Sequence, residues 1–202
     1  AFKNACRHRG AALVTEPEGV ARRFICPYHA WGYSSEGELK SVPEAHNFAC
    51  LNKADTALAQ VRCETWRGFI FINFDENAGP LADFLGPLTT QIDDFPIDDM
   101  VVKHMIAVEI DCNWKTYVDN YLEGYHVPHV HPELNKLLDY RSYVTETKRW
   151  YSMQFSPLES GDDLYGSGEA LYYFMYPNTM LNILPGRLQT NRVLPLPNNR
   201  CR

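Results

Sequence analysis

Two stretches near the start of the chain, CRHRGAAL at residues 6–13 and CPYHAWGY at residues 26–33, decide how this sequence is expected to fold. Each places one cysteine and one histidine close together, as Cys-x-His in the first and Cys-x-x-His in the second, with 17 residues between the two pairs. Thiolates and imidazoles at such spacings are ligands for zinc or for an iron–sulfur cluster. The pattern therefore predicts two tight loops that meet around a metal centre.

The division of the ligands between the loops distinguishes these two kinds of metal centre. A zinc finger usually groups its ligands as a cysteine pair and a histidine pair, whereas here each loop supplies one of each. That division suits a cluster of two inequivalent irons, one held by both thiolates and the other by both imidazoles, which is the arrangement of a Rieske centre. Zinc is the minor alternative, and four buried side chains that bind no metal are the other.

A second unusual stretch, DNYLEGYHVPHVHPEL at residues 119–134, gathers two carboxylates and three histidines within thirteen residues. On a helix, Glu123 lies one turn before His126. Pro128 is expected to end that helix and bend the chain, so that His131 returns towards His126. Two histidines on a broken helix end, with carboxylates nearby, favour a mononuclear non-haem iron(II) site. A surface loop with several histidines is the alternative, and His129 is expected to lie beside the metal ligands rather than on the metal.

Together, these stretches resemble the oxygenase (alpha) subunits of Rieske non-haem iron oxygenases, of the aromatic-ring-hydroxylating and choline–carnitine–betaine monooxygenase type. The resemblance covers nearly the whole chain. In the second motif it is carried by Asn113, Trp114, Lys115, Asp119, Asn120, Glu123, His126 and His131.

The resemblance assigns the metal ligands. It implies that Cys6 and Cys26 hold one iron of a Rieske [2Fe–2S] cluster and that His8 and His29 hold the other. It also implies that a mononuclear Fe(II) is bound by two histidines of the second motif, His126 and His131.

The resemblance also assigns roles to the polar residues around the second motif. In this family the carboxylate that binds the mononuclear iron is an Asp far downstream, which is expected beyond residue 202. Glu123 is instead expected to bridge, accepting a hydrogen bond from His126 and reaching a cluster histidine, at the position of His29, on a neighbouring subunit. Asp119 and Asn120 are further catalytic candidates.

An α+β fold is expected. Strand-like runs such as RRFICPY and GFIFINF, with glycine and proline turns between them, predict a small β-rich cluster domain over residues 1–80. A connector over residues 81–100 follows, with a short helix near 81–94. Residues 101–202 are expected to form the start of a helix-grip (START-like) catalytic domain with an antiparallel sheet. Its expected elements are a strand over 104–111, a helix over 113–127 and strands near 170–176, 179–184 and 188–196.

Composition excludes several other functions. The 202 residues include 19 lysines and arginines against 25 aspartates and glutamates, a net charge of −6, and no basic run suggests nucleic acid. No apolar run is long enough to cross a membrane. The other four cysteines lack a disulfide-like spacing, which favours reduced thiols in a cytoplasmic protein. Because the chain has no initiator Met and its first candidate ligand is the sixth residue, we expect it to be a fragment of a longer protein.

The implied reaction is reductive activation of O₂. An NAD(P)H-dependent flavin and iron–sulfur reductase, or a ferredoxin, is expected to supply electrons to the cluster, which would pass them to the mononuclear iron of the next subunit in a homotrimer. Two rivals lack this chemistry: a Rieske electron carrier without catalysis and a zinc-stabilised binding module.

The substrate is the least specified feature. Glu rather than Asp at position 123 resembles relatives that act on choline, carnitine or betaines, by hydroxylation or demethylation next to a quaternary nitrogen. The 12 tyrosines and 4 tryptophans are enough to form an aromatic cage for such a cation, and YYFMYPNTML at 172–181 is expected to contribute one wall. The same aromatic residues also suit an aromatic ring, as in a ring-hydroxylating dioxygenase, or the core alone.

Overall fold

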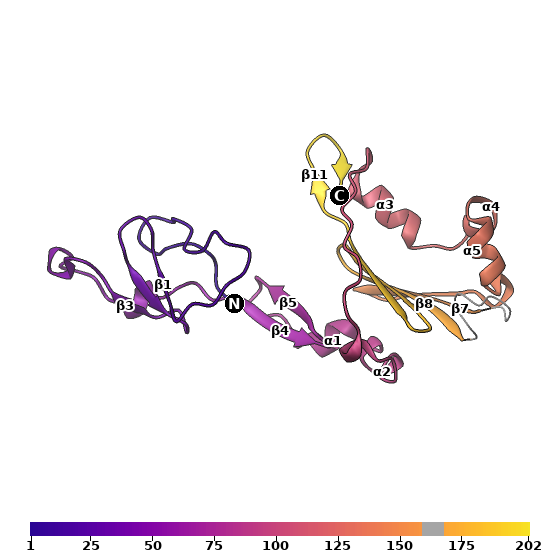
Figure 1. Cartoon of the computed structure of the whole chain (residues 1–202), viewed down its shortest axis with the longest axis horizontal. Helices are drawn as coiled ribbons and strands as arrows, with labels where there is room; N and C mark the ends of the chain where they lie inside the picture. The colour runs from indigo at the N-terminus through magenta and orange to yellow at the C-terminus, as the bar shows by residue number, and fades with distance from the viewer. Residues whose placement is uncertain (159–167) are drawn as a thin grey trace. The chain divides into compact units, whose positions relative to one another are not determined.

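The computed structural model describes residues 1–158 and 168–202 and contains two compact units, residues 1–79 and 80–202 (Figure 1). Helices and strands are both present, and every strand pair described is antiparallel. The expected α+β fold class is therefore confirmed. Within the described residues, no helix has the length and apolar character that a bilayer crossing requires.

The first unit contains a three-stranded sheet and a separate hairpin. The sheet comprises β1 (Arg23–Ile25), β2 (Gly32–Ser34) and β3 (Leu39–Ser41), and the hairpin comprises β4 (Arg62–Trp66) and β5 (Phe69–Asn73). Short 3₁₀ helices, η1 (Ala45–Asn47) and η2 (Ala54–Thr56), lie between them. In the hairpin turn, Arg67 and Gly68 both have positive φ, at 46° and 83°. A two-residue turn of this kind matches the twist of the strands that it joins.

The core of the first unit surrounds the two cysteines that were predicted as ligands. Its buried members are Cys6, Cys26, Trp31, Tyr33, Leu39 and Leu58. Both thiols are thus held inside packed apolar surroundings rather than on a loop tip.

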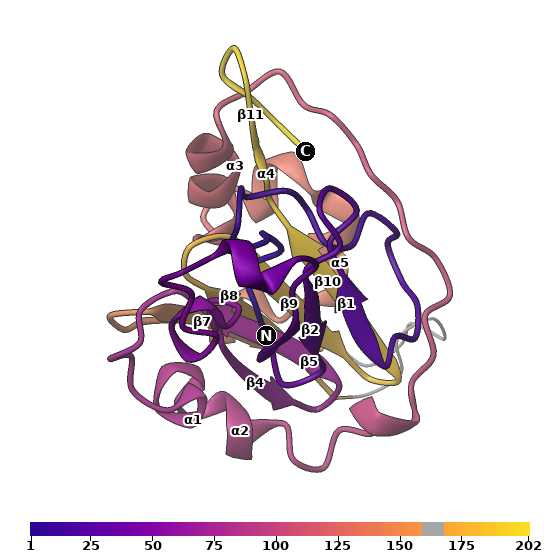
Figure 2. The same ribbon diagram turned by 90° about the vertical axis from the view of Figure 1, so that its left-hand side faces the viewer.

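The second unit is organised on a five-stranded antiparallel sheet in which strands that follow one another in the chain lie side by side (Figure 2). Its strands, in spatial order, are β10 (Arg187–Arg192), β9 (Thr179–Leu184), β8 (Glu169–Met175), β7 (Tyr151–Pro157) and β6 (Val144–Thr147). A small pair, β11 (Pro195–Leu196) and β12 (Arg200–Cys201), follows.

Helices cover both faces of this sheet. They are α1 (Leu81–Leu85), α2 (Leu88–Gln91), α3 (Trp114–Tyr121), α4 (Val127–Val130) and α5 (Pro132–Leu137), with 3₁₀ helices η3 (Ile97–Asp99) and η4 (Tyr140–Ser142). Figure 1 shows α3, α4 and α5 on the same side of the sheet. On the other face, the Tyr173 hydroxyl donates to the Leu85 carbonyl at the end of α1, at 3.3 Å. The candidate site lies on the opposite face of the sheet, which α3 covers.

Two expected elements of the second unit differ from the structure. The helix near 81–94 is divided into α1 and α2, because Gly86 has a φ of 56° and Pro87 follows it. The strand expected over 104–111 is absent, and of these eight residues only Ile110 forms a bridge, with Cys201. Met105 is 90% exposed. Apolar residues alone do not make a strand, since a strand needs a neighbour for its backbone hydrogen bonds.

The helix expected over 113–127 is shorter than predicted, and Pro128 does not end it. α3 begins where the Asn113 side chain accepts a hydrogen bond from the Lys115 N–H at 3.0 Å, and it ends at Tyr121. Gly124 lies against Tyr143, so that a Cβ on this glycine would be 2.5 Å from the tyrosine ring. Pro128 instead occupies the first turn of α4, where the missing N–H costs nothing because it would have no partner inside the helix.

Candidate metal centres

The two cysteine–histidine loops of the first unit share one backbone geometry. In each, the cysteine N–H donates to the carbonyl five residues later, and the cysteine carbonyl accepts from the N–H four residues later, at 2.8–3.0 Å. The fourth residue after each cysteine is left-handed, with a φ of 73° at Gly10 and 53° at Ala30. The two loops are therefore near-copies of one turn, in which the histidine is the second residue after Cys6 and the third after Cys26.

This arrangement places Cys6 and Cys26 in one core and the rings of His8 and His29 side by side. Cys6 and Cys26 are each 3% exposed, whereas His29 is exposed and His8 half-buried. The His8 and His29 ring centroids are 4.7 Å apart, and Trp31 stacks on His8 at 4.8 Å. Within the described residues, the His8 Nδ1 is buried and has no hydrogen-bond partner. An inner pair of thiols, an outer pair of imidazoles and an unpartnered ring nitrogen fit a two-iron cluster.

The electrostatics favour the states that bind metal. Burial alone would raise the pKa of the Cys26 thiol, but hydrogen bonds from the backbone N–H groups of His29 and Tyr28 bring it below its ordinary value. The pKa of His8 is lowered by burial, and further by the charges of His29 and Arg9. A thiolate and a neutral imidazole are the forms that coordinate metal ions.

Tyr33 supports the first thiol from within the core. Its hydroxyl lies 3.3 Å from the Cys6 Sγ and accepts a hydrogen bond from the Arg7 N–H at 3.1 Å. Burial raises the pKa of Tyr33, and its hydrogen bond with Cys6 raises it further. The hydroxyl therefore keeps its proton, which it can direct at the sulfur.

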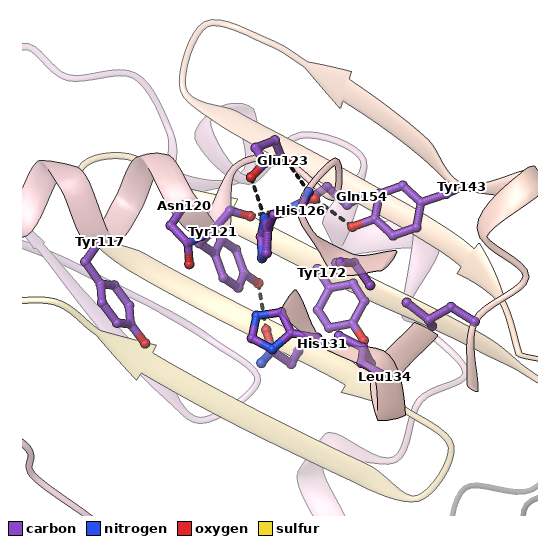
Figure 3. A pocket seen from close by; sticks show the side chains of 13 residues that line it. Tyr117, Asn120, Tyr121, Glu123, His126, His131, Leu134, Tyr143, Gln154 and Tyr172 are labelled. Carbon is purple, nitrogen blue, oxygen red and sulfur yellow. Dashed lines mark hydrogen bonds and ion pairs between the residues drawn. The ribbon is translucent and has the colours of Figure 1, made fainter. Parts of the chain in front are cut away.

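The second predicted centre is built around the single turn of α4. His126 precedes the helix and His131 follows it, and their ring centroids are 5.1 Å apart at an angle of 72° (Figure 3). Among the described residues, no group of three or more His, Cys, Asp or Glu side chains is close enough to hold one metal ion. The two histidines thus form a pair of neighbouring candidate ligands. In the described part of the chain, no carboxylate joins them as a third ligand to the same metal ion.

Glu123 is joined to His126 by two contacts. One carboxylate oxygen meets the His126 Nδ1 and the other accepts from the His126 backbone N–H at 3.2 Å. Burial alone would raise the pKa of Glu123, but these hydrogen bonds hold it below its ordinary value. An ionised carboxylate only accepts hydrogen bonds, so the His126 Nδ1 must carry a proton. In the tautomer that carries its proton on Nδ1, the Nε2 is free to bind a metal.

A cavity of about 190 Å³ adjoins these side chains, between α3, α4 and the sheet (Figure 3). Its aromatic wall consists of Tyr117, Tyr121, Tyr143 and Tyr172, and its uncharged polar groups are Asn120, Gln154 and Asn182. Both histidines and Glu123 line the same cavity. The arrangement can therefore hold a small molecule beside a metal bound by His126 and His131.

A buried amide connects the sheet to the end of α3. Gln154 is 2% exposed. Its Nε2 donates to the Tyr121 carbonyl at 2.6 Å, and its Oε1 accepts from the Tyr143 hydroxyl at 2.7 Å (Figure 3). Because Tyr121 is the last residue of α3, this contact satisfies a carbonyl that has no partner within the helix.

The remaining predicted residues of the second motif divide into two groups. Asn120 lines the cavity, whereas Asp119 and His129 are exposed and do not. Sequence reasoning did not identify the cavity residues Gln154 and Asn182. The signal was a polar side chain inside a largely apolar strand, and the register aligns both residues with Tyr172 on one face.

Comparisons with known proteins match both parts of the chain. Residues 1–61 match the Rieske [2Fe-2S] domain, and residues 97–202 match the ring-hydroxylating alpha subunit (catalytic domain). The chloroplastic choline monooxygenase of Beta vulgaris is 31% identical over 212 residues, which cover 100% of this chain and 47% of that protein. The carnitine monooxygenase oxygenase subunit of Escherichia coli (strain K12) is 32% identical over 193 residues, covering 92% of this chain and 51% of that protein.

Other relatives share part of the sequence or the fold. The alpha subunit of benzene 1,2-dioxygenase from Pseudomonas putida is 40% identical over 124 residues, covering 56% of this chain and 26% of that protein. A solved quaternary ammonium Rieske monooxygenase in complex with L-carnitine has a TM-score of 0.80 at 26% identity and covers 99% of this chain and 55% of that one.

The chain spans about half the length of the first two of these curated relatives. The catalytic-domain match alone covers more than half of the chain, and the cluster domain precedes it as in the family. The chain therefore belongs to the ring-hydroxylating alpha subunit family of oxidoreductases, whose Rieske and catalytic domains carry a [2Fe–2S] cluster and a mononuclear iron.

Proposed function

We propose that this chain supplies the cluster domain and the histidine pair of a Rieske oxygenase that hydroxylates or demethylates a small quaternary ammonium compound. The observation that carries the proposal is the Glu123–His126–His131 group beside a tyrosine-lined cavity. Neither a pure electron carrier nor a zinc-stabilised binding module accounts for this second group.

The residues of the first unit would hold the cluster. Cys6 and Cys26 would bind the inner iron and His8 and His29 the outer iron, because the thiols are buried and the rings lie nearer the surface. The cluster would accept electrons one at a time from a reductase or ferredoxin, which is a proposal for the whole protein.

The residues of the second unit would hold the mononuclear iron. His126 and His131 would bind it, with the Asp that is expected beyond residue 202 of the same protein as the third ligand. When bound, this iron supplies the chemistry of O₂ activation. Glu123 fixes the His126 ring by accepting a hydrogen bond from its Nδ1. With its side chain 44% exposed, it also has room to accept a hydrogen bond from a cluster histidine of a neighbouring subunit, so we propose that it bridges the two metal sites in a homotrimer.

Two catalytic candidates of the second motif remain, Asn120 and Asp119. We propose that Asn120, which lines the cavity, contacts the substrate or its oxidant. Asp119 stays a prediction as a catalytic residue. The cytoplasmic location expected from the composition also stays a prediction.

The cavity favours a small cation. Four tyrosine rings line it, and Glu123 adds a negative charge whose pKa is held low. Ring faces and a carboxylate both attract a quaternary ammonium group. The names of the relatives agree, since they include choline and carnitine monooxygenases.

An aromatic hydrocarbon is the second candidate substrate. The local identity with a benzene 1,2-dioxygenase alpha subunit is higher, at 40%. A cavity of about 150 Å³ is known to hold benzene, so a cavity of about 190 Å³ has room for one ring.

The experiment uses the full-length protein with iron in both sites and its cluster reduced without oxygen. O₂ is then added with choline, glycine betaine, L-carnitine or benzene, and cluster reoxidation and products are measured. We expect a quaternary ammonium compound to accelerate reoxidation and to gain oxygen or lose a methyl group. Oxygenation of benzene alone would establish the second candidate. A full-length protein that could not be loaded with mononuclear iron would contradict both.

A further inference from the structure

One amide on the cavity wall is oriented by the fold but has an unused donor. Asn182 lies on β9 opposite Tyr172 in the register of the sheet and lines the cavity. Its Oδ1 accepts a hydrogen bond from the Tyr121 hydroxyl at 2.7 Å, closer than the Leu181 and Tyr173 carbonyls that the same hydroxyl meets at 3.3 and 3.5 Å. Burial raises the pKa of Tyr121, and the charges of neighbouring tyrosines raise it further. The hydroxyl therefore keeps the proton that holds the amide oxygen in place.

The other end of this amide is open to the cavity. Within residues 1–158 and 168–202, no hydrogen bond to the Asn182 Nδ2 is found, and this atom is not one of the buried polar atoms left without a partner. Asn182 is half-buried and lines the cavity. Two N–H bonds are thus offered to whatever occupies the cavity, and they can only donate.

A quaternary ammonium group cannot use such a donor. Its nitrogen has no N–H bond and no lone pair, so only charge and ring faces hold it, and these contacts fix its position better than its orientation. A second, directional contact is needed to present one carbon of the substrate to the iron. The acceptor for that contact must be an oxygen elsewhere on the substrate.

We propose that Asn182 binds an oxygen acceptor of the substrate, either a hydroxyl or a carboxylate, on the carbon chain that carries the quaternary nitrogen, and that Tyr121 positions its amide. This inference rests on the proposed function, because it assumes a quaternary ammonium substrate in this cavity. It adds the requirement that the substrate carry an oxygen.

The test compares three ligands with the same cationic group. Choline carries a hydroxyl, glycine betaine a carboxylate, and ethyltrimethylammonium neither. Their dissociation constants are measured by calorimetry on the full-length protein with both metal sites filled. We expect choline to bind about 10-fold tighter than ethyltrimethylammonium if a hydroxyl is the acceptor, or glycine betaine about 100-fold tighter if a carboxylate is. The larger ratio identifies the acceptor.

Variants then test whether Asn182 causes the difference between the dissociation constants of the ligands with and without an oxygen. Asn182→Leu has a similar size but no donor, so the ratio should fall to about 1 while ethyltrimethylammonium binds within about 2-fold of the unchanged protein. Asn182→Asp keeps an acceptor for Tyr121 but repels a carboxylate, so glycine betaine should bind more weakly than to Asn182→Leu. Tyr121→Phe should reduce the ratio only in part, because the amide keeps its donors but loses its fixed orientation.

The control is Asn191→Leu, which makes the same change on β10 outside the cavity and should leave every dissociation constant unchanged. A preserved ratio in Asn182→Leu would overturn the inference. So would an equal loss of affinity for all three ligands, which would indicate a structural role. If no quaternary ammonium compound bound to the unchanged protein, the proposed substrate class and this inference would both be wrong.

Discussion

Replacing Gln154 with leucine is expected to destabilise the second unit through two hydrogen bonds at once. The amide donates to the Tyr121 carbonyl at 2.6 Å and accepts from the Tyr143 hydroxyl at 2.7 Å. Gln154 is 2% exposed, so its amide is shielded from bulk water. Leucine has nearly the same volume but leaves both partners without a hydrogen bond.

The size of this destabilisation follows from the two groups that would lose their hydrogen-bond partner. A buried donor or acceptor without a partner costs about 1–3 kcal/mol, which gives about 2–6 kcal/mol for the pair. The added apolar surface of leucine offsets about 1 kcal/mol. We expect the free energy of unfolding to fall by about 3 kcal/mol, which for a cooperative unit of about 150–250 residues corresponds to a decrease in melting temperature of about 6–12 °C.

The measurement is differential scanning calorimetry of the full-length protein. The control is Gln189→Leu, in the same row of the sheet. Gln189 is exposed, and among the described residues its side chain bonds only to Asn191, at 3.1 Å. This substitution should change the free energy of unfolding by about 0.5 kcal/mol or less. A melting temperature of Gln154→Leu that equals that of Gln189→Leu would refute the reasoning.

Three further predictions concern the two metal sites of the full-length protein. Tyr33→Phe removes a hydroxyl that stabilises the reduced cluster through Cys6, so a redox titration should give a lower potential. Cys6→Ser replaces a soft thiolate with a hard oxygen and should abolish the visible absorption of the cluster; an intact spectrum would contradict its role as ligand. Glu123→Gln should leave both irons bound but slow single-turnover oxidation of the reduced cluster, whereas lost mononuclear iron would make Glu123 a ligand and an unchanged rate would make it an ordinary surface residue.

The cluster loops were predictable because their information is local. Each loop contains one cysteine and one histidine within four residues, and one turn geometry serves both, with Gly10 or Ala30 at the left-handed position. The structure brings the two histidine rings to 4.7 Å. Only the packing of the two loops against each other depends on residues far apart in the sequence. The core that they share around Trp31 and Tyr33 accounts for it.

Features that depend on distant contacts were not predictable. α3 ends at Tyr121 and not at Pro128, and the ring of Tyr143, 19 residues after Gly124, lies against that glycine just beyond the helix. Similarly, Gln154 and Asn182 gain their positions in the cavity from sheet register and from Tyr121. In a single sequence, these residues are only polar positions in apolar strands.

The properties of Glu123 explain how one carboxylate can serve two imidazoles. One oxygen meets the His126 ring and the other its backbone N–H, and these bonds hold the pKa of Glu123 below its ordinary value despite partial burial. A group with a depressed pKa is ionised throughout the neutral range, and what it contributes to stability is lost only as the pH falls through that lowered value. An ionised carboxylate offers about four acceptor positions, and the side chain is 44% exposed. It can therefore hold His126 in the tautomer that leaves the Nε2 of that ring free. It can also accept a hydrogen bond from an N–H group of a second imidazole ring.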